Sequence, residues 1–172
     1  MHIVDAAKNK AKKVMADVEE NIAETDILHT LKTEHREVAA LLKEMVEAEN
    51  GASRKKLLGQ IKAALIPHLR AEEKVVYQPL IVDRDKGLRT DGFEGEAEHR
   101  LADRLMDELS AIENAASPEF AGTAKVLMEM IEHHVKEEED DIFDDVKEKF
   151  SKAERFEMNE AFLAEKTKVS IS

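Results

Sequence analysis

The chain has 172 residues and a mass of 19.4 kDa, enough for one domain with a sizeable core but not for two. Its 26 Lys and Arg residues against 38 Asp and Glu give a formal charge of −12. This balance argues against a nucleic acid or an anionic membrane as partner, because both attract a basic face. The absence of Cys excludes disulfides, thiolate-ligated zinc, iron–sulfur clusters and a cysteine nucleophile.

The N-terminal sequence, MHIVDAAKNKAKK, lacks the features of a signal peptide. No apolar run approaches the roughly 20 residues of a membrane-spanning helix. We therefore expect a cytoplasmic, soluble globular protein that binds neither nucleic acid nor membrane. A monomer and a homodimer are both compatible with the sequence.

The predicted elements are all helices, because the chain has few Pro and Gly and many Ala, Leu, Glu, Lys and Met residues. Turn and capping signals divide it at Asn50-Gly51, Lys86-Gly87, Ser117-Pro118 and the capping box of Ser151 and Glu154. The helices between these signals are predicted near residues 3–23, 26–49, 53–84, 94–114, 118–149 and 151–166. The longest loop is expected over the sequence RTDGFEGE, after Lys86-Gly87.

The four middle segments carry apolar residues at alternating spacings of three and four, the pattern of packed helices. This pattern predicts an all-α fold, an up-down-up-down antiparallel four-helix bundle, over residues 26–149. The apolar stripe of residues 3–23 is out of register with the next helix, so residues 1–25 are interpreted as a separate helical extension. Residues 150–172 are expected to form a C-terminal helix and tail.

Six ionisable residues interrupt the apolar stripes, where they are costly without partners: His35, His68, Glu72, His99, His134 and Glu138. They also repeat along the chain. EHREVAALLKE at 34–44 matches EHRLADRLMDE at 98–108, and HLRAEEKVVY at 68–77 matches HVKEEEDDIF at 134–143. The chain therefore looks like a duplicated helix hairpin, and each copy carries one lone His and one HxxxE motif.

Four imidazoles and two carboxylates form a nitrogen and oxygen donor set that suits iron or manganese better than structural zinc. Six side chains are too many for one tetrahedral ion, and carboxylates can bridge two ions. If Glu72 and Glu138 both bridge and each metal takes two His, one position per metal stays open beside a bridging oxide or hydroxide. Open positions indicate reactivity toward a small molecule. The alternative is a purely structural role for these residues in the core.

This arrangement over residues 26–149 resembles the hemerythrin-like family, also called HHE cation-binding domains. The resemblance implies a non-haem di-iron centre, oxo- or hydroxo-bridged, with two iron ions held by the six residues inside a four-helix bundle. Manganese and zinc are the less favoured metals. A ferritin-like site is disfavoured because it needs ExxH motifs, whereas this chain has HxxxE.

Two departures from the oxygen-carrying hemerythrins argue against reversible oxygen storage. Those proteins place a fifth His where this chain has Gly95, and their last carboxylate is an Asp five residues after the His, whereas Glu138 follows His134 by four. Relatives with four His and two Glu are associated with peroxide or nitric oxide chemistry, oxygen sensing and iron handling.

We therefore predict a di-iron protein that acts on or senses peroxide, O2 or NO. It would be either an oxidoreductase directed at peroxide or NO or a sensor. A non-catalytic, metal-stabilised regulatory or interaction module and an iron-handling protein are the alternatives.

The neighbours of the six residues are harder to place. Glu73 and Glu139 are predicted to be peripheral, because each follows a core-facing Glu by one residue and so lies about 100° round the helix from the apolar stripe. Tyr77 and Phe143 follow their His by nine residues, half a turn away on an ideal helix, so they are expected to pack on the flank. Glu34, Glu98 and Asp141 are the candidates to accept a hydrogen bond from a metal-bound imidazole. Glu96 is the candidate for an extra oxygen donor.

Overall fold

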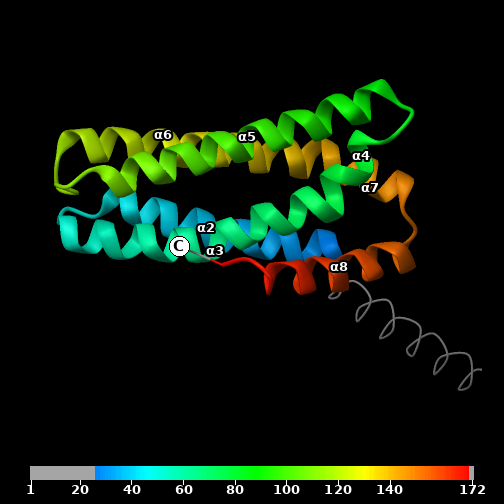
Figure 1. Ribbon diagram of the computed structural model, residues 1–172, viewed down its shortest axis with the longest axis horizontal. Coiled ribbons are helices and arrows are strands. Elements are labelled where there is room, and N and C mark those ends of the chain that lie inside the picture. The colour runs from blue at the N-terminus through cyan, green and yellow to red at the C-terminus, as the bar shows by residue number, and fades with distance from the viewer. Residues whose placement is uncertain (1–25, 171–172) are drawn as a thin grey trace, which may run out of the picture.

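The structure, a computed structural model, describes residues 26–170. The helix predicted near residues 3–23 lies outside the described residues. Within them the chain folds into helices and forms no strand, as predicted. Four helices build the bundle in Figure 1: α2 (Ile27–Glu47), α3 (Gly51–Glu72), α5 (Lys86–Ala111) and α6 (Pro118–Glu137).

Two of these helices continue through a single π-helical turn into a short α-helix. The second helix passes through η1 (Glu73–Tyr77) into α4 (Gln78–Ile81). The fourth passes through η2 (Glu138–Ile142) into α7 (Phe143–Lys149). The last helix, α8 (Lys152–Lys166), begins at the predicted capping box of Ser151 and Glu154.

The third bundle helix begins at Lys86, eight residues before its predicted start near 94, so the expected loop over RTDGFEGE is wrong. Asp85 caps the helix by accepting hydrogen bonds from the backbone N–H groups of Gly87 and Leu88, at 2.7 and 3.2 Å. The glycines in this stretch allow close packing instead of forming a turn. A Cβ at Gly92 would lie 2.9 Å from Ile81 Cγ1.

The four bundle helices pack as neighbours in a ring, in which α2 contacts α3 and α6, and α5 contacts the same two helices. Helix α8 returns along the outside of the bundle, where it contacts α2, α3 and η1 (Figure 1). One long side of the bundle therefore carries an extra layer of helix. None of the helices within residues 26–170 combines the length and apolar character needed to cross a membrane.

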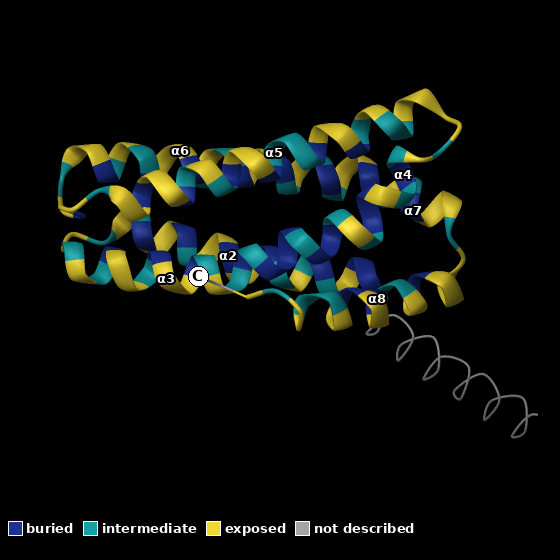
Figure 2. Ribbon diagram, viewed as in Figure 1, coloured by how far each residue is buried: buried dark blue, intermediate teal, exposed yellow. Residues whose placement is uncertain are grey.

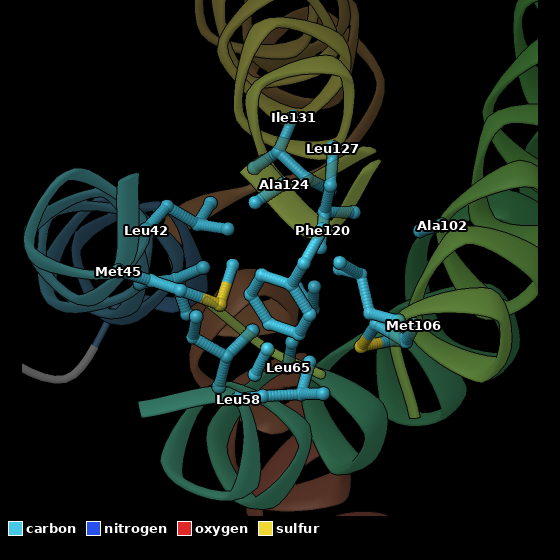
Figure 3. Packing of buried hydrophobic residues seen from close by; sticks show 14 of the residues in the cluster. Leu42, Met45, Leu58, Leu65, Ala102, Met106, Phe120, Ala124, Leu127 and Ile131 are labelled. Carbon is cyan, nitrogen blue, oxygen red and sulfur yellow. The ribbon is translucent and has the colours of Figure 1, made fainter. Parts of the chain in front are cut away.

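Buried residues line the inner faces of the helices (Figure 2) and form two apolar clusters. In the larger cluster, Phe120 points into the centre among leucines and methionines from the other three bundle helices (Figure 3). The smaller cluster lies toward the other end and contains Tyr77, Phe143 and Phe162. On α2, His35 falls between Leu31 of the smaller cluster and Val38 of the larger one. His35 therefore lies at the junction of the two apolar clusters.

Candidate metal centre

The structure brings the six predicted residues together in the bundle core. Each is at most 5% exposed: His35, His68, Glu72, His99, His134 and Glu138. His35 comes from α2, His68 and Glu72 from α3, His99 from α5, His134 from α6, and Glu138 from η2. Short distances link them across the helices, so residues separated by up to 103 positions share one buried site.

Two groups of possible ligands share Glu72. His35, His68 and Glu72 form one group, and Glu72, His99 and His134 form the other. Glu72 Oε2 lies 3.5 Å from His68 Nε2 and 3.4 Å from His99 Nε2. The first group takes its two His from the first repeat, and the second group takes both from the second repeat. Glu72 therefore stands between two candidate ion positions.

Glu138 completes the set from the other repeat. Its Oε2 lies 3.2 Å from His35 Nε2. Burial alone would lower the pKa of His35, but the adjacent Glu138 carboxylate outweighs burial and raises it to about 9. For Glu138, contact with His35 likewise outweighs burial and lowers its pKa. Without a metal, the site thus contains a buried His35–Glu138 ion pair.

A second carboxylate holds each imidazole from behind, through Nδ1. The four pairs and their Nδ1-to-oxygen distances are His35 with Glu139, 3.0 Å; His68 with Glu34, 2.9 Å; His99 with Glu73, 3.1 Å; and His134 with Glu98, 2.7 Å. We call these four acids the outer carboxylates. Because an ionised carboxylate only accepts hydrogen bonds, Nδ1 carries the proton and donates it, which leaves Nε2 as the ring nitrogen that could coordinate a metal.

The outer carboxylates form a closed ring of hydrogen bonds between neighbouring helices of the bundle. Each one is adjacent in sequence to a predicted ligand on its own helix and holds the His of the next helix in the ring. The prediction that Glu73 and Glu139 are peripheral is wrong, because both bond directly to an imidazole. A signal was present in the sequence, since an acid adjoins the same ligand in both repeats.

Several buried atoms at the centre have no hydrogen-bond partner. Five buried side-chain nitrogen or oxygen atoms in residues 26–170 lack one, and four of them are His35 Nε2, both carboxylate oxygens of Glu72, and Glu138 Oε2. His99 Nε2 and His134 Nε2 also face each other at 3.3 Å. His35 Nε2 and Glu138 Oε2 are the two atoms of the ion pair, 3.2 Å apart but outside hydrogen-bond geometry. Buried polar atoms without hydrogen bonds are costly, and a bound cation would satisfy the Glu72 and Glu138 oxygens together. The donor set therefore fits metal ions.

Tyr77 lies at the site, and its predicted place on the flank is wrong. Its side chain is fully buried, and its hydroxyl donates a hydrogen bond to Glu138 Oε1 at 3.3 Å. Its ring centroid lies 5.2 Å from that of His99. Burial, reinforced by the Glu138 and Glu72 charges, raises the pKa of Tyr77 well above its usual value, so the phenol keeps its proton.

Phe143, the counterpart of Tyr77 in the second repeat, also faces the site. Its ring stacks on His35 with centroids 6.2 Å apart. The cause is the same in both repeats, because η1 and η2 each place an extra residue in one turn. That residue removes about 100° of rotation, so nine residues bring the aromatic ring to about 80° from its His instead of 180°.

Gly95 makes room for Tyr77. A Cβ at this position would lie 2.5 Å from Tyr77 Cζ, closer than side-chain packing allows. The Tyr77 ring therefore occupies space beside the position where oxygen-carrying hemerythrins place their fifth His.

The two flanks of the centre differ. A cavity of about 110 Å3 between α5 and η2 reaches His134 and Glu138, and Asp141 lines it without bonding to an imidazole. On the opposite flank α8 covers the site, with the Phe162 ring edge-on to His68 at 5.6 Å between centroids. Glu96 lies away from the centre and accepts a hydrogen bond from Gln78.

Comparison with known proteins agrees with this geometry. The profile of the family described as "Hemerythrin HHE cation binding domain" matches residues 26–146. A protein named DNA nickase from Nostoc sp. (strain PCC 7120 / SAG 25.82 / UTEX 2576) is 25% identical over 144 residues, which cover 84% of this chain and 40% of the relative. The chain thus spans less than half of that protein's length. No solved structure matches the chain. The chain belongs to the hemerythrin HHE cation-binding family, whose family trait is metal binding.

Proposed function

We propose that the bundle core holds two iron ions and that this di-iron centre acts on or senses a small molecule, namely peroxide, O2 or NO. The observation that carries the proposal is Glu72, which is shared by two ligand groups and has two buried oxygens without hydrogen-bond partners. A single ion bound by one His pair and Glu72 would leave the other His pair beside Glu72 without an ion.

The chemistry of the donors favours iron. Four imidazole nitrogens and two carboxylates without a thiolate suit iron or manganese, whereas structural zinc sites are closed by four ligands and commonly use Cys. His35 and His68 would hold one ion, and His99 and His134 the other. Glu72 would lie between them, and Glu138 would supply the second carboxylate. The bound iron would supply redox chemistry toward a small oxidant or radical.

The protein's own residues would orient and shield the centre. The outer carboxylates fix the tautomer and direction of each imidazole, so the four Nε2 atoms point inward. Phe143 and Phe162 cover two of the imidazoles with apolar rings. Tyr77 directs a proton at Glu138. The cavity of about 110 Å3 has room for only a few water-sized molecules, which agrees with a diatomic or peroxide ligand.

Metal loading tests the di-iron part of the proposal. We expect the full chain, loaded anaerobically with Fe2+ and then exposed to air, to hold two irons by elemental analysis and to show the visible absorption of a bridged diferric pair. Glu72→Ala/Glu138→Ala should lose the iron. Glu47→Ala/Glu129→Ala, which removes two exposed acids, is the matched control and should keep it. Substoichiometric iron without visible absorption in the wild-type chain would overturn the proposal.

Spectral response tests the small-molecule part. Peroxide or NO added to the loaded protein should change its visible spectrum rapidly, and turnover of either molecule would distinguish an enzyme from a sensor. A spectrum that stays unchanged, in a protein that unfolds when its metal is removed, would instead support the non-catalytic, metal-stabilised module.

The Nostoc relative is named for DNA nicking, and we do not propose that activity for this chain. A net charge of −12 opposes binding to a phosphate backbone. We propose instead that the partner is the small molecule that reaches the centre.

A further inference from the structure

The cavity beside His134 has an unusual lining. Six of its nine lining residues are acids: Asp91, Glu94, Glu98, Glu137, Glu138 and Asp141. The other three are Gly95, His134 and Ile142, so no Lys or Arg lines it. We call this opening between α5 and η2 the acidic mouth. Such a lining attracts cations and repels anions.

The inner end of the acidic mouth presents a buried acceptor. Glu138 lines the cavity, is fully buried, and has no hydrogen-bond partner for its Oε2. His134, beside it, has Nε2 directed at His99. An ion in the mouth would therefore meet, at its inner end, a buried carboxylate oxygen without a hydrogen bond and an imidazole nitrogen, which surface acids alone do not provide.

The outer acids of the mouth repel one another. Partial burial, together with the charges of Asp141 and Asp85, raises the pKa of Asp91. Two partly buried acids elsewhere, Asp103 and Glu34, each pair with a cation, Arg70 and Lys166, whereas Asp91 and Asp141 form no ion pair within residues 26–170. The repulsion between Asp91 and Asp141 would be relieved by a bound cation.

A second opening reaches the centre, and its chemistry is different. The groove between α2 and α6 ends at His35, and its lining combines two cations, Arg36 and Lys136, with three acids, Glu132, Glu139 and Asp140. The two cations offset most of the negative charge of the three acids, so this groove attracts a cation less strongly than the acidic mouth does. On the α8 side, Phe162 covers His68. The acidic mouth is therefore the electrostatically favoured path for a cation.

We infer that the acidic mouth captures a divalent cation and delivers it to His134 and Glu138, and so is the loading route of the centre. The inference rests on the proposed di-iron function, in which the cation is Fe2+.

Loading kinetics test this route. Metal-free full-length chain is mixed with Co2+, whose visible absorption changes when nitrogen and oxygen ligands replace water. Asp91→Asn/Asp141→Asn should slow the bimolecular loading rate at low salt by roughly tenfold, the scale of electrostatic steering. The difference should shrink in about 0.5 M salt, where surface charges are screened. The final Co2+ and Fe2+ stoichiometries should equal those of the wild-type chain.

The matched control neutralises two acids at the other opening, Glu132→Gln/Asp140→Asn, and should leave the rate nearly unchanged. An unchanged rate in Asp91→Asn/Asp141→Asn, or an equal slowing in both double variants, would overturn the inference. Wild-type loading of only one ion would overturn the di-iron proposal, while the ratio of the rates would still decide the route. A wild-type chain that takes up no metal would overturn both.

Discussion

The two halves of the bundle carry the same ligand pattern in different surroundings. In the first half, α2 to α4, the imidazole of His68 lies under Phe162, and Lys166 bonds to its outer carboxylate Glu34 at 2.5 Å. In the second half, α5 to α7, His134 borders the acidic mouth. The duplication thus sets two similar candidate ion positions. Helix α8 covers the flank at His68, whereas the flank at His134 stays open.

The aromatic residues show the same division. The fully buried ring at the end of η1 is Tyr77, which bonds to Glu138, whereas its counterpart Phe143 has no polar group. Each ring contacts a His of the opposite half, His99 for Tyr77 and His35 for Phe143. Of the two central carboxylates, Glu72 and Glu138, only Glu138 therefore receives a phenol hydrogen bond.

We expect the largest effect on metal binding from the removal of Glu72, the residue that both ligand groups share. Glu72→Ala should abolish binding of both ions, because Glu72 belongs to both ligand groups. His134→Ala should remove the ion of the second half and leave that of the first. Elemental analysis after loading and desalting measures this difference. Two ions retained in Glu72→Ala would show that Glu138 alone can bridge the halves.

The next largest effect comes from truncating Phe162, the side chain of α8 that covers His68 in the first half. Phe162→Ala should destabilise the protein by about 3–5 kcal/mol, because a fully buried ring is replaced by a cavity. Leu163→Ala, at the adjacent and 43% exposed position, should change the stability by less than about 0.5 kcal/mol. Urea unfolding followed by circular dichroism measures both. Equal effects would show that α8 does not cover the core.

A pH titration sharpens the comparison for the ion of the first half. His35, whose pKa is raised to about 9, carries a proton at neutral pH in the metal-free protein, and that proton must leave before Nε2 can bind a cation. Metal affinity should therefore increase with pH, by about tenfold per pH unit below 9 for this one proton. Competition with a chelator of known pH dependence measures the slope. A flat profile between pH 6 and 8 would contradict the buried His35–Glu138 pair.

The packing of Tyr77 against α5 depends on the absence of a side chain at Gly95. Gly95→Ala should cost about 1–3 kcal/mol, because its Cβ would force the Tyr77 ring from its place. Gly122→Ala is the control, since the added methyl group would meet nothing within 4 Å beyond its own stretch of helix backbone; it should stabilise α6 by about 0.5–1 kcal/mol. Thermal unfolding measures the two opposite signs. A neutral Gly95→Ala would mean that Tyr77 moves freely.

The sequence predicts the bundle and the six core residues because both follow from helical periodicity and from the repeat. It does not predict where that periodicity fails. The π-helical turns η1 and η2 rotate Tyr77 and Phe143 toward the centre, and no local residue pattern marks these turns. Gly92 and Gly95 indicate a loop when read locally, yet they serve close packing against a neighbouring helical segment.

The outer carboxylates are missed for a related reason. Glu73 and Glu139 point away from the seam of their own helix, so a single-helix projection assigns them to solvent. They acquire their role only from the His of the neighbouring helix, after the bundle forms. Contacts that one helix makes with another require the packing arrangement, which periodicity does not contain.

The smallest effect makes the two halves alike. Tyr77→Phe puts in the first half the residue that the second half has at Phe143, and it removes the hydrogen bond to Glu138 Oε1. The metal-free protein should lose about 1 kcal/mol of stability, the usual contribution of one hydrogen bond. The loaded protein should lose less, because a bound cation also satisfies Glu138. Urea unfolding of both forms measures the difference, and Tyr77→Leu separates ring packing from the hydroxyl. Equal losses in the two forms would mean that the phenol stabilises the fold independently of the centre, and the difference between the halves would then lie in their flanks alone.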